Sequence, residues 1–230
     1  ARASNDDPIP RQLSLYVHVP FCFSPCFYCG CNKIITRDLK RAEPYLQRLI
    51  REAALLAPLF DWDREVIQLH LGGGTPNFMD TDKIATLVDS LAHHFHFSSL
   101  LDRDFSIELD PRSVKPGDVA ELARIGFNRA SLGVQDFDPA VQQAVNRIQP
   151  LEMVEKAVEE SRKAKFQSIN ADLIYGLPKQ TLKSFSHTLD SLIRIAPDRI
   201  ALYNYAHLPQ RFKAQRLIDD SDLPSAEERL

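Results

Sequence analysis

Short apolar segments alternate with amphipathic helical patterns along nearly the whole of this sequence, and this alternation constrains the fold more than any other feature. Six segments have the length and the β-branched or aromatic content of buried strands. They are residues 13–19, 66–71, 105–109, 129–133, 168–174 and 199–205. Because strands separated by helices pair in parallel, the pattern predicts an α/β fold built from βα units.

The segments between these strands carry helical periodicity. Apolar residues over 81–95 recur at the spacing of one helix face, which predicts an amphipathic helix capped by Asp80 or Thr81. Further helices are expected after Pro44, around Met153, and over residues 118–124 and 181–195. Six strands joined by right-handed helical crossovers can curl into a barrel that stays open. We therefore expect an open (β/α)6 barrel with its helices on the outside.

Polar residues gather where the predicted strands end. These positions are His18, Gly72, Gly73, Gly74, Thr75, Glu108, Asp110, Gln135, Asp172 and Asn204. The carboxyl ends of parallel strands meet at one end of a barrel, and that end carries the chemistry in barrel enzymes. The pattern therefore favours one shared site, although any water-soluble fold also places polar groups at strand ends.

All four cysteines of the chain fall in the loop that follows the first strand. Cys22, Cys26, Cys29 and Cys31 have the spacing C-x3-C-x2-C-x-C. This clustering is a poor layout for disulfides across a large domain, but it suits an iron–sulfur cluster, whose thiolate ligands are a few residues apart. The alternatives are a structural zinc site, which usually pairs two knuckles separated in sequence, and a set of inert buried thiols.

The first three cysteines match the C-x3-C-x2-C signature of radical S-adenosylmethionine enzymes. Three thiolates on a four-iron cluster leave one iron open. An open iron can bind the amino and carboxylate groups of S-adenosylmethionine. An electron from the reduced cluster then cleaves the sulfonium and releases a 5'-deoxyadenosyl radical.

The run Gly72-Gly73-Gly74-Thr75-Pro76 follows the second predicted strand. Consecutive glycines let a backbone approach a ligand closely, although such a run taken alone is more often a tight turn. Beside the cysteine loop, it is similar to the glycine motif that binds the amino group of S-adenosylmethionine in this superfamily. The combination of the two motifs favours a cosubstrate site.

Four further polar residues allow both a binding role and a plain structural one. Glu108 could hold a ribose or an ammonium group, or it could be a solvated acid at a strand end. Asp172 could bind a ligand or cap a turn, and Gln135 poses the same choice. Arg147 could likewise belong to a surface ion pair that contributes little to stability.

Six segments resemble the oxygen-independent coproporphyrinogen III oxidase (dehydrogenase) family. They are YVHVPFC with the cysteines that follow it up to CGCNK, HLGGGTPNF, SIELDPRS, SLGVQDFDPAVQQAVNR, DLIYGLPKQT and NYAHLP. A related haem chaperone family shares the cluster and glycine motifs, but Cys31 and the stretch after it favour the oxidase. The resemblance implies a three-quarter barrel of the radical S-adenosylmethionine type. A haem chaperone-like homologue and a structural zinc-binding module are the alternative functions.

The resemblance also implies roles for individual residues. Cys22, Cys26 and Cys29 would bind a [4Fe-4S] cluster, and Cys31 would not be a ligand. Tyr16, Gly73 and Glu108 would contact the S-adenosylmethionine on the open iron. The positions that match a second S-adenosylmethionine are Tyr28, Gly74, Thr75, Gln135, Arg147, Asp172 and Ala206.

The implied reaction removes a hydrogen atom from the β-carbon of a propionate side chain, and loss of carbon dioxide and an electron then leaves a vinyl group. Two such steps convert coproporphyrinogen III to protoporphyrinogen IX in haem biosynthesis. The substrate carboxylates would need cationic partners, for which Lys33, Arg37 and Arg147 are candidates. The further expectations are a reducing electron donor such as a flavodoxin and a monomeric enzyme.

Composition limits the expected binding partners and the expected cellular location of the protein. A formal net charge of −3 gives no basic field for nucleic acid. No stretch approaches the roughly 20 apolar residues of a membrane helix, and the start of the chain lacks signal-peptide features, so a cytoplasmic protein is expected. We interpret residues 1–12 as an N-terminal segment and 13–230 as the barrel core, with the family's C-terminal domain absent.

Overall fold

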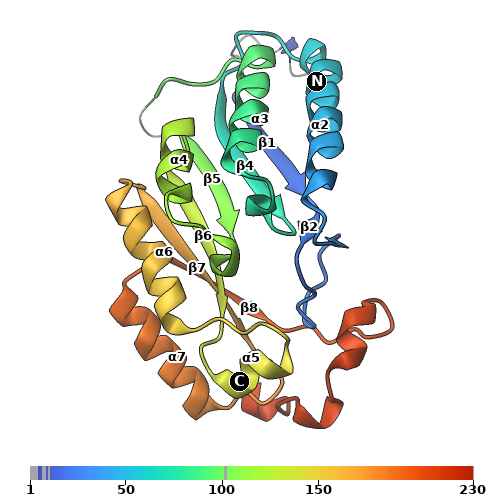
Figure 1. Ribbon diagram of the computed structural model, residues 1–230, viewed down its shortest axis with the longest axis vertical. Coiled ribbons are helices and arrows are strands. Elements are labelled where there is room, and N and C mark those ends of the chain that lie inside the picture. Colours follow the sequence, from blue (N-terminus) through green and yellow to red (C-terminus); the bar gives the residue numbers. More distant parts are fainter. Residues whose placement is uncertain (1–4, 7–8, 10, 101–102, 230) are drawn as a thin grey trace.

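A six-stranded parallel sheet forms the centre of the molecule (Figure 1). The computed structural model describes residues 5–6, 9, 11–100 and 103–229. In spatial order the strands are β1 (Leu13–Val19), β4 (Val66–Gly73), β5 (Asp104–Leu109), β6 (Arg129–Gln135), β7 (Ser168–Tyr175) and β8 (Arg199–Asn204). The spatial order follows the chain order, and β1 and β8 form the two edges of this sheet. The expected open (β/α)6 barrel is thus confirmed.

The helices follow the strands along one face of the sheet (Figure 1), as successive crossovers of one hand require. They are α2 (Ala42–Leu56), α3 (Thr81–His94), α4 (Asp118–Ile125), α5 (Pro139–Ala144), α6 (Leu151–Lys163) and α7 (Leu182–Ile195). Asp80 caps α3 by accepting a hydrogen bond from the Lys83 backbone N–H at 2.9 Å, so the cap is Asp80 rather than Thr81. The short α5 had no sequence prediction.

Short elements complete the description. The two-residue strands β2 (Phe21–Cys22) and β3 (Ile34–Ile35) pair with each other beside the main sheet. The 3-10 helices are η1 (Leu39–Arg41), η2 (Ala57–Leu59), η3 (Pro76–Phe78), η4 (Pro111–Ser113), η5 (Lys213–Leu217), η6 (Asp220–Asp222) and η7 (Glu227–Arg229).

The main hydrophobic core lies between the sheet and the helices. Alternate strand residues face the helices and are buried, among them Leu71, Ile107 and Leu132, which have no exposed surface. Their neighbours face the inside of the barrel, and on β6 these include Arg129 and Ser131, which are half-buried. A closed barrel of eight strands fills its interior with branched apolar side chains. Here the inner face is polar and leaves space for ligands.

Two strands end two residues later than their sequence pattern predicts. β4 extends to Gly73 because its pairing with β1 continues to the end of that strand, where Val19 lies opposite Gly73. β6 extends to Gln135 through a register shift against β7. Glycines and a bulge weaken a strand signal in the sequence, so the ends were placed too early.

Most of the N-terminal segment expected over residues 1–12 lies outside the described residues. Within the described part of the chain, no helix has the length and apolar character needed to span a membrane.

Candidate cluster and cosubstrate site

A cavity of about 270 Å³ opens at the carboxyl end of the sheet. Eleven of the thirteen site residues predicted from the sequence line it. They are Cys22, Cys26, Tyr28, Cys29, Gly73, Gly74, Thr75, Glu108, Gln135, Arg147 and Asp172. The parallel topology explains this convergence, because each of these residues lies in the cysteine loop, in the carboxyl-terminal half of a strand or after a strand.

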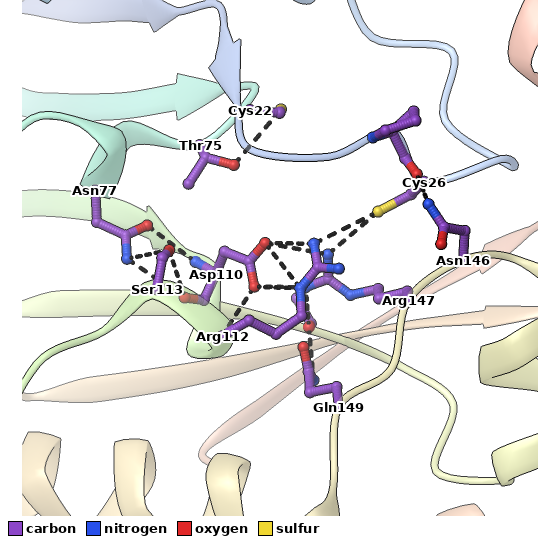
Figure 2. A network of polar contacts seen from close by, with 12 residues as sticks. Cys22, Cys26, Thr75, Asn77, Asp110, Arg112, Ser113, Asn146, Arg147 and Gln149 are labelled. Atoms are coloured by element: carbon purple, nitrogen blue, oxygen red, sulfur yellow. Dashed lines mark hydrogen bonds and ion pairs between the residues drawn. The ribbon is translucent and has the colours of Figure 1, made fainter. Parts of the chain in front are cut away.

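The two ends of the cysteine loop are bonded to each other, and its middle is bonded to another part of the chain. At its ends, Ile34 N–H donates to the Pro20 carbonyl at 2.7 Å, and Thr36 N–H donates to the Cys22 carbonyl at 2.9 Å. In the middle, Phe27 N–H donates to the carbonyl of Val145 at 2.9 Å. The loop therefore spans from β1 to the turn after α5, which places Cys26 across the cavity from Cys22 (Figure 2).

The cysteine thiols have different electrostatic surroundings. Burial raises the pKa of Cys22, which accepts a hydrogen bond from Thr75 Oγ1 at 3.5 Å. A hydrogen bond from Cys31 lowers the pKa of Cys29, and Lys33 adds to the effect. Cys29 is therefore better prepared than Cys22 to act as a thiolate ligand.

The arrangement of thiols fits a cluster better than a single ion. A mononuclear zinc site needs its ligands gathered around one point. Among the described residues, no three His, Cys, Asp or Glu side chains are grouped in that way. Cys22, Cys26 and Cys29 instead face one cavity from separate positions, which suits a group with several metal atoms.

The glycine run brings the end of β4 against the start of the cysteine loop. A Cβ atom on Gly74 would lie 2.8 Å from the Phe21 carbonyl oxygen and from the backbone of Pro20. Gly73 has φ 116°, a conformation that favours glycine. Its N–H donates to Glu108 Oε2 at 3.0 Å. The glycines thus permit a close approach that larger residues would prevent.

Glu108 and Tyr16 are connected through His70. Glu108 Oε1 lies 3.2 Å from His70 Nε2, and the His70 ring stacks on that of Tyr16 at 5.7 Å between ring centroids. Tyr16 does not line the cavity of the cysteines, because its side chain is 59% exposed and its hydroxyl contacts His18 Nδ1 at 3.0 Å. The side chain of His70 therefore separates Tyr16 from Glu108, which lines the cavity.

Gln135 ends β6, and Asp172 lies on β7 three residues before that strand ends. Gln135 has φ 68°, which is uncommon for a residue other than glycine and marks local strain that functional sites often hold. Asp172 accepts hydrogen bonds from Ser131 Oγ at 2.9 Å and Asn170 Nδ2 at 2.8 Å. Burial raises its pKa. The interpretation of Asp172 as a simple turn cap is wrong, since its partners are side chains of the inner barrel face.

Arg147 is only 7% exposed, so its interpretation as a surface ion pair is also wrong. Its guanidinium donates to the Gly133 carbonyl at 2.6 Å and lies 3.4 Å from Asp110 Oδ2. Asp110 also holds Arg112, with 2.6 Å between Oδ2 and Nη2 (Figure 2). The cavity wall beneath Cys26 is thus built from two arginines and one aspartate.

Ala206 does not line the cavity but is joined to it by a residue that the sequence did not reveal. Gln215 is 2% exposed, and its Nε2 donates to the carbonyls of both Tyr28 at 2.9 Å and Ala206 at 3.1 Å. It lies in a 3-10 helix without periodicity, so no sequence signal pointed to it. Arg112 was likewise unpredicted, although it lies in the SIELDPRS segment.

This fold, with a thiol-lined cavity at the strand ends, defines a class of barrel enzymes that hold an iron–sulfur cluster. The family model of the Radical SAM superfamily matches residues 16–192, and the chain belongs to this superfamily. The superfamily implies a [4Fe-4S] cluster and S-adenosylmethionine.

Its relatives are more specific. The chain is 49% identical to an oxygen-independent coproporphyrinogen III oxidase of Pseudomonas aeruginosa, and 48% identical to one of Escherichia coli. Each alignment covers 96% of this chain and 48% of the relative, so the chain spans about half the length of these proteins.

Solved structures agree with these relatives. The structure of coproporphyrinogen III oxidase from Escherichia coli, described as a radical SAM enzyme, matches with a TM-score of 0.92 and 48% identity. The match covers 96% of this chain and 50% of that one. The archaeal Elp3 of Methanocaldococcus infernus matches with a TM-score of 0.61 at 16% identity, covering 96% of this chain and 52% of that one, which shows a shared fold alone.

Proposed function

We propose that this chain is the catalytic core of an oxygen-independent coproporphyrinogen III oxidase. Such an enzyme converts two propionate side chains of coproporphyrinogen III to vinyl groups and yields protoporphyrinogen IX. One observation carries the proposal: the three cysteines of the signature, the glycine run and the strand-end acids line a single cavity in a chain that closely resembles such oxidases.

In this proposal Cys22, Cys26 and Cys29 bind the cluster, and Cys31 does not. When bound and reduced, the cluster and S-adenosylmethionine together supply a 5'-deoxyadenosyl radical. The Cys31 N–H donates to Cys29 Sγ at 3.4 Å, and Lys33 Nζ donates to the Cys29 carbonyl at 2.8 Å. These contacts give Cys31 and Lys33 a supporting role around a ligand.

The walls of the cavity would hold the cosubstrate. Glu108 offers a carboxylate that the Gly73 N–H and His70 orient, and such a group suits an ammonium or a ribose hydroxyl. Gln135, Arg147 and Asp172 line the same cavity and would supply groups for a second S-adenosylmethionine. Tyr16 and Ala206 do not line the cavity, so they would contact S-adenosylmethionine only after the site closes, or would influence it through neighbouring residues.

The substrate would lie in the polar interior below the cavity. A second space of about 330 Å³ there shares Glu108 and Asp172 with the cavity and is also lined by Arg129 and Arg199. The sequence did not suggest these two arginines as cationic partners for propionate carboxylates. Arg129 lies 3.3 Å from Asp104 Oδ2 through its Nε, so a substrate carboxylate would share it with Asp104. Of the three cations expected from the sequence, Lys33 and Arg147 line the upper cavity, whereas Arg37 is exposed outside it.

Further parts of the proposal concern the whole enzyme. We interpret residues 13–230 as the barrel core. The alignment leaves about half of the relatives' length without a matching segment in this chain. We further infer a monomer and a reducing protein such as a flavodoxin as the electron donor.

The test is anaerobic incubation of the reconstituted chain with coproporphyrinogen III, S-adenosylmethionine and a chemical reductant. We expect mass spectrometry to detect porphyrinogen that has lost carbon dioxide and two hydrogen atoms from a propionate. Deoxyadenosine formation with an unchanged porphyrinogen would contradict the substrate assignment. Stoichiometric binding of haem, added in place of coproporphyrinogen III, would favour the haem chaperone-like alternative.

A further inference from the structure

Two guanidinium groups approach the thiol of Cys26 (Figure 2). Arg112 Nη2 and Arg147 Nη1 each lie 3.6 Å from Cys26 Sγ in hydrogen-bonding geometry. Cys26 is only 8% exposed, so water screens these contacts little. Hydrogen bonds from charged donors in such surroundings are among the strongest that a protein makes.

Asp110 fixes Arg112 in this position. Its Oδ2 accepts from Arg112 Nη2 at 2.6 Å, and its Oδ1 accepts from Arg112 Nε at 2.9 Å. The same Oδ1 accepts from the Arg112 backbone N–H at 3.0 Å, which fastens the turn at η4. Because Nη2 carries two hydrogens, it can serve the carboxylate with one and the sulfur with the other. A planar fork held on one edge by a carboxylate is a well-ordered donor.

The side-chain bonds of the two arginines differ. Arg147 also donates to the Gly133 carbonyl at 2.6 Å, so it joins the end of β6 to the network. The side-chain hydrogen bonds of Arg112 go to Asp110 and Cys26. Two guanidiniums and one carboxylate leave a net positive charge beside the Cys26 sulfur. Asp110 is therefore arranged to orient Arg112 without cancelling the positive field.

We propose that Arg112 is a positioning residue that raises the reduction potential of the cluster by donating a charged hydrogen bond to the Cys26 ligand sulfur. The inference rests on the proposed function, because it requires a cluster bound through Cys26. Reduction adds negative charge to an iron–sulfur cluster. Donors to its sulfurs and nearby positive charge stabilise the reduced form more than the oxidised one. The consequence is an easier supply of the electron that cleaves S-adenosylmethionine.

The test is an anaerobic redox titration of the reconstituted cluster, followed by electron paramagnetic resonance without S-adenosylmethionine. The variants are R112Q, R112K and the control R124Q. Arg124 has a side chain 72% exposed on α4, where it pairs with Glu121 away from the cavity. We expect R112Q to retain about four irons per chain and to show a more negative midpoint potential than wild type. R112K should shift less, because lysine keeps the charge without the fork, and R124Q should match wild type.

A midpoint potential of R112Q equal to that of wild type, at full iron content, would overturn the inference and leave Arg112 a structural role in the turn. If R112Q fails to fold or to take up iron, the equally uncharged R112M decides, because it also removes the charged hydrogen bond and an unshifted midpoint there has the same meaning. A wild-type chain that binds no cluster would overturn the proposed function as well. A wild-type cluster that cleaves S-adenosylmethionine beside an unshifted R112Q would overturn this inference alone.

Discussion

Asp110 is the residue on which the charge balance of the cavity wall depends. Its side chain is 12% exposed and lies between two guanidiniums. Burial opposes its ionisation, but the charges of Arg147 and Arg112 outweigh that effect and lower its pKa below the ordinary 3.8. Breaking such a pair by removing one partner leaves buried charge uncompensated and typically costs about 3–5 kcal/mol.

We therefore expect Asp110→Asn to lower the free energy of unfolding of the apo-protein by about 3 kcal/mol at pH 7. Because the pKa of Asp110 is lower in the folded than in the unfolded chain, this contribution is complete above about pH 3.8. It is lost as the pH falls through the folded pKa. Urea unfolding of both proteins at a series of pH values from 7 down to about 2 measures it, because the wild-type advantage should begin to shrink below about pH 3.8. Asp80→Asn, in an exposed pair that keeps a good helix cap, should change stability by less than about 1 kcal/mol. A wild-type advantage that stays constant as the pH falls below about 3.8 would contradict the account.

Gln215 shows how a buried amide can hold two distant segments together. Besides its two carbonyl partners, its Oε1 accepts from the Leu208 N–H at 2.5 Å. We expect Gln215→Ala to reduce unfolding free energy by about 1–3 kcal/mol, because buried backbone groups lose their partners. Equilibrium dialysis should also show weaker S-adenosylmethionine binding by the reconstituted variant, since Tyr28 loses its support. The exposed Gln210→Ala is the matched control, and equal effects of both changes would refute this role.

At the scale of elements, the site depends on how closely β4 and the cysteine loop pack. Gly74→Ala would push the loop away from the strand, because the added Cβ meets backbone rather than a movable side chain. We expect the reconstituted variant to bind much less iron per chain than wild type. The control is Gly117→Ala, where a Cβ has open space and φ 91° adds only local strain. Full iron content in the Gly74 variant would show that this close approach is unnecessary.

Most of the strands and helices could be predicted from the sequence, because their apolar residues follow a regular pattern. Strands such as β5 and β7 are short apolar runs between helical patterns, and α3 repeats its apolar face at the helical period. Elements that depend on tertiary contacts were not readable. The helix α5 has six residues, and β2 exists only through its pairing with β3. Neither is long enough to give a periodic signal.

At the scale of the whole molecule, the parallel topology places sequence-distant motifs in one cavity. Cys22 follows β1, Gly73 ends β4 and Asp172 lies in the carboxyl-terminal half of β7. Their convergence could be predicted once a parallel sheet was inferred. The partners that orient them could not be predicted. Arg112 and Gln215 lie in the short 3-10 helices η4 and η5, and elements this short leave no periodic pattern in the sequence. The exposed positions of Tyr16 and Ala206 likewise followed from no feature of the sequence.

The central claim is that this cavity holds a cluster that cleaves S-adenosylmethionine, and the most direct measurement compares wild type with Cys22→Ala and Cys31→Ala. After anaerobic reconstitution, iron content and reductive formation of 5'-deoxyadenosine are determined for each protein. The account predicts about four irons and deoxyadenosine for wild type, loss of both in Cys22→Ala, and retained iron in Cys31→Ala. Zinc in place of iron, or a cluster that never cleaves the cosubstrate, would contradict it.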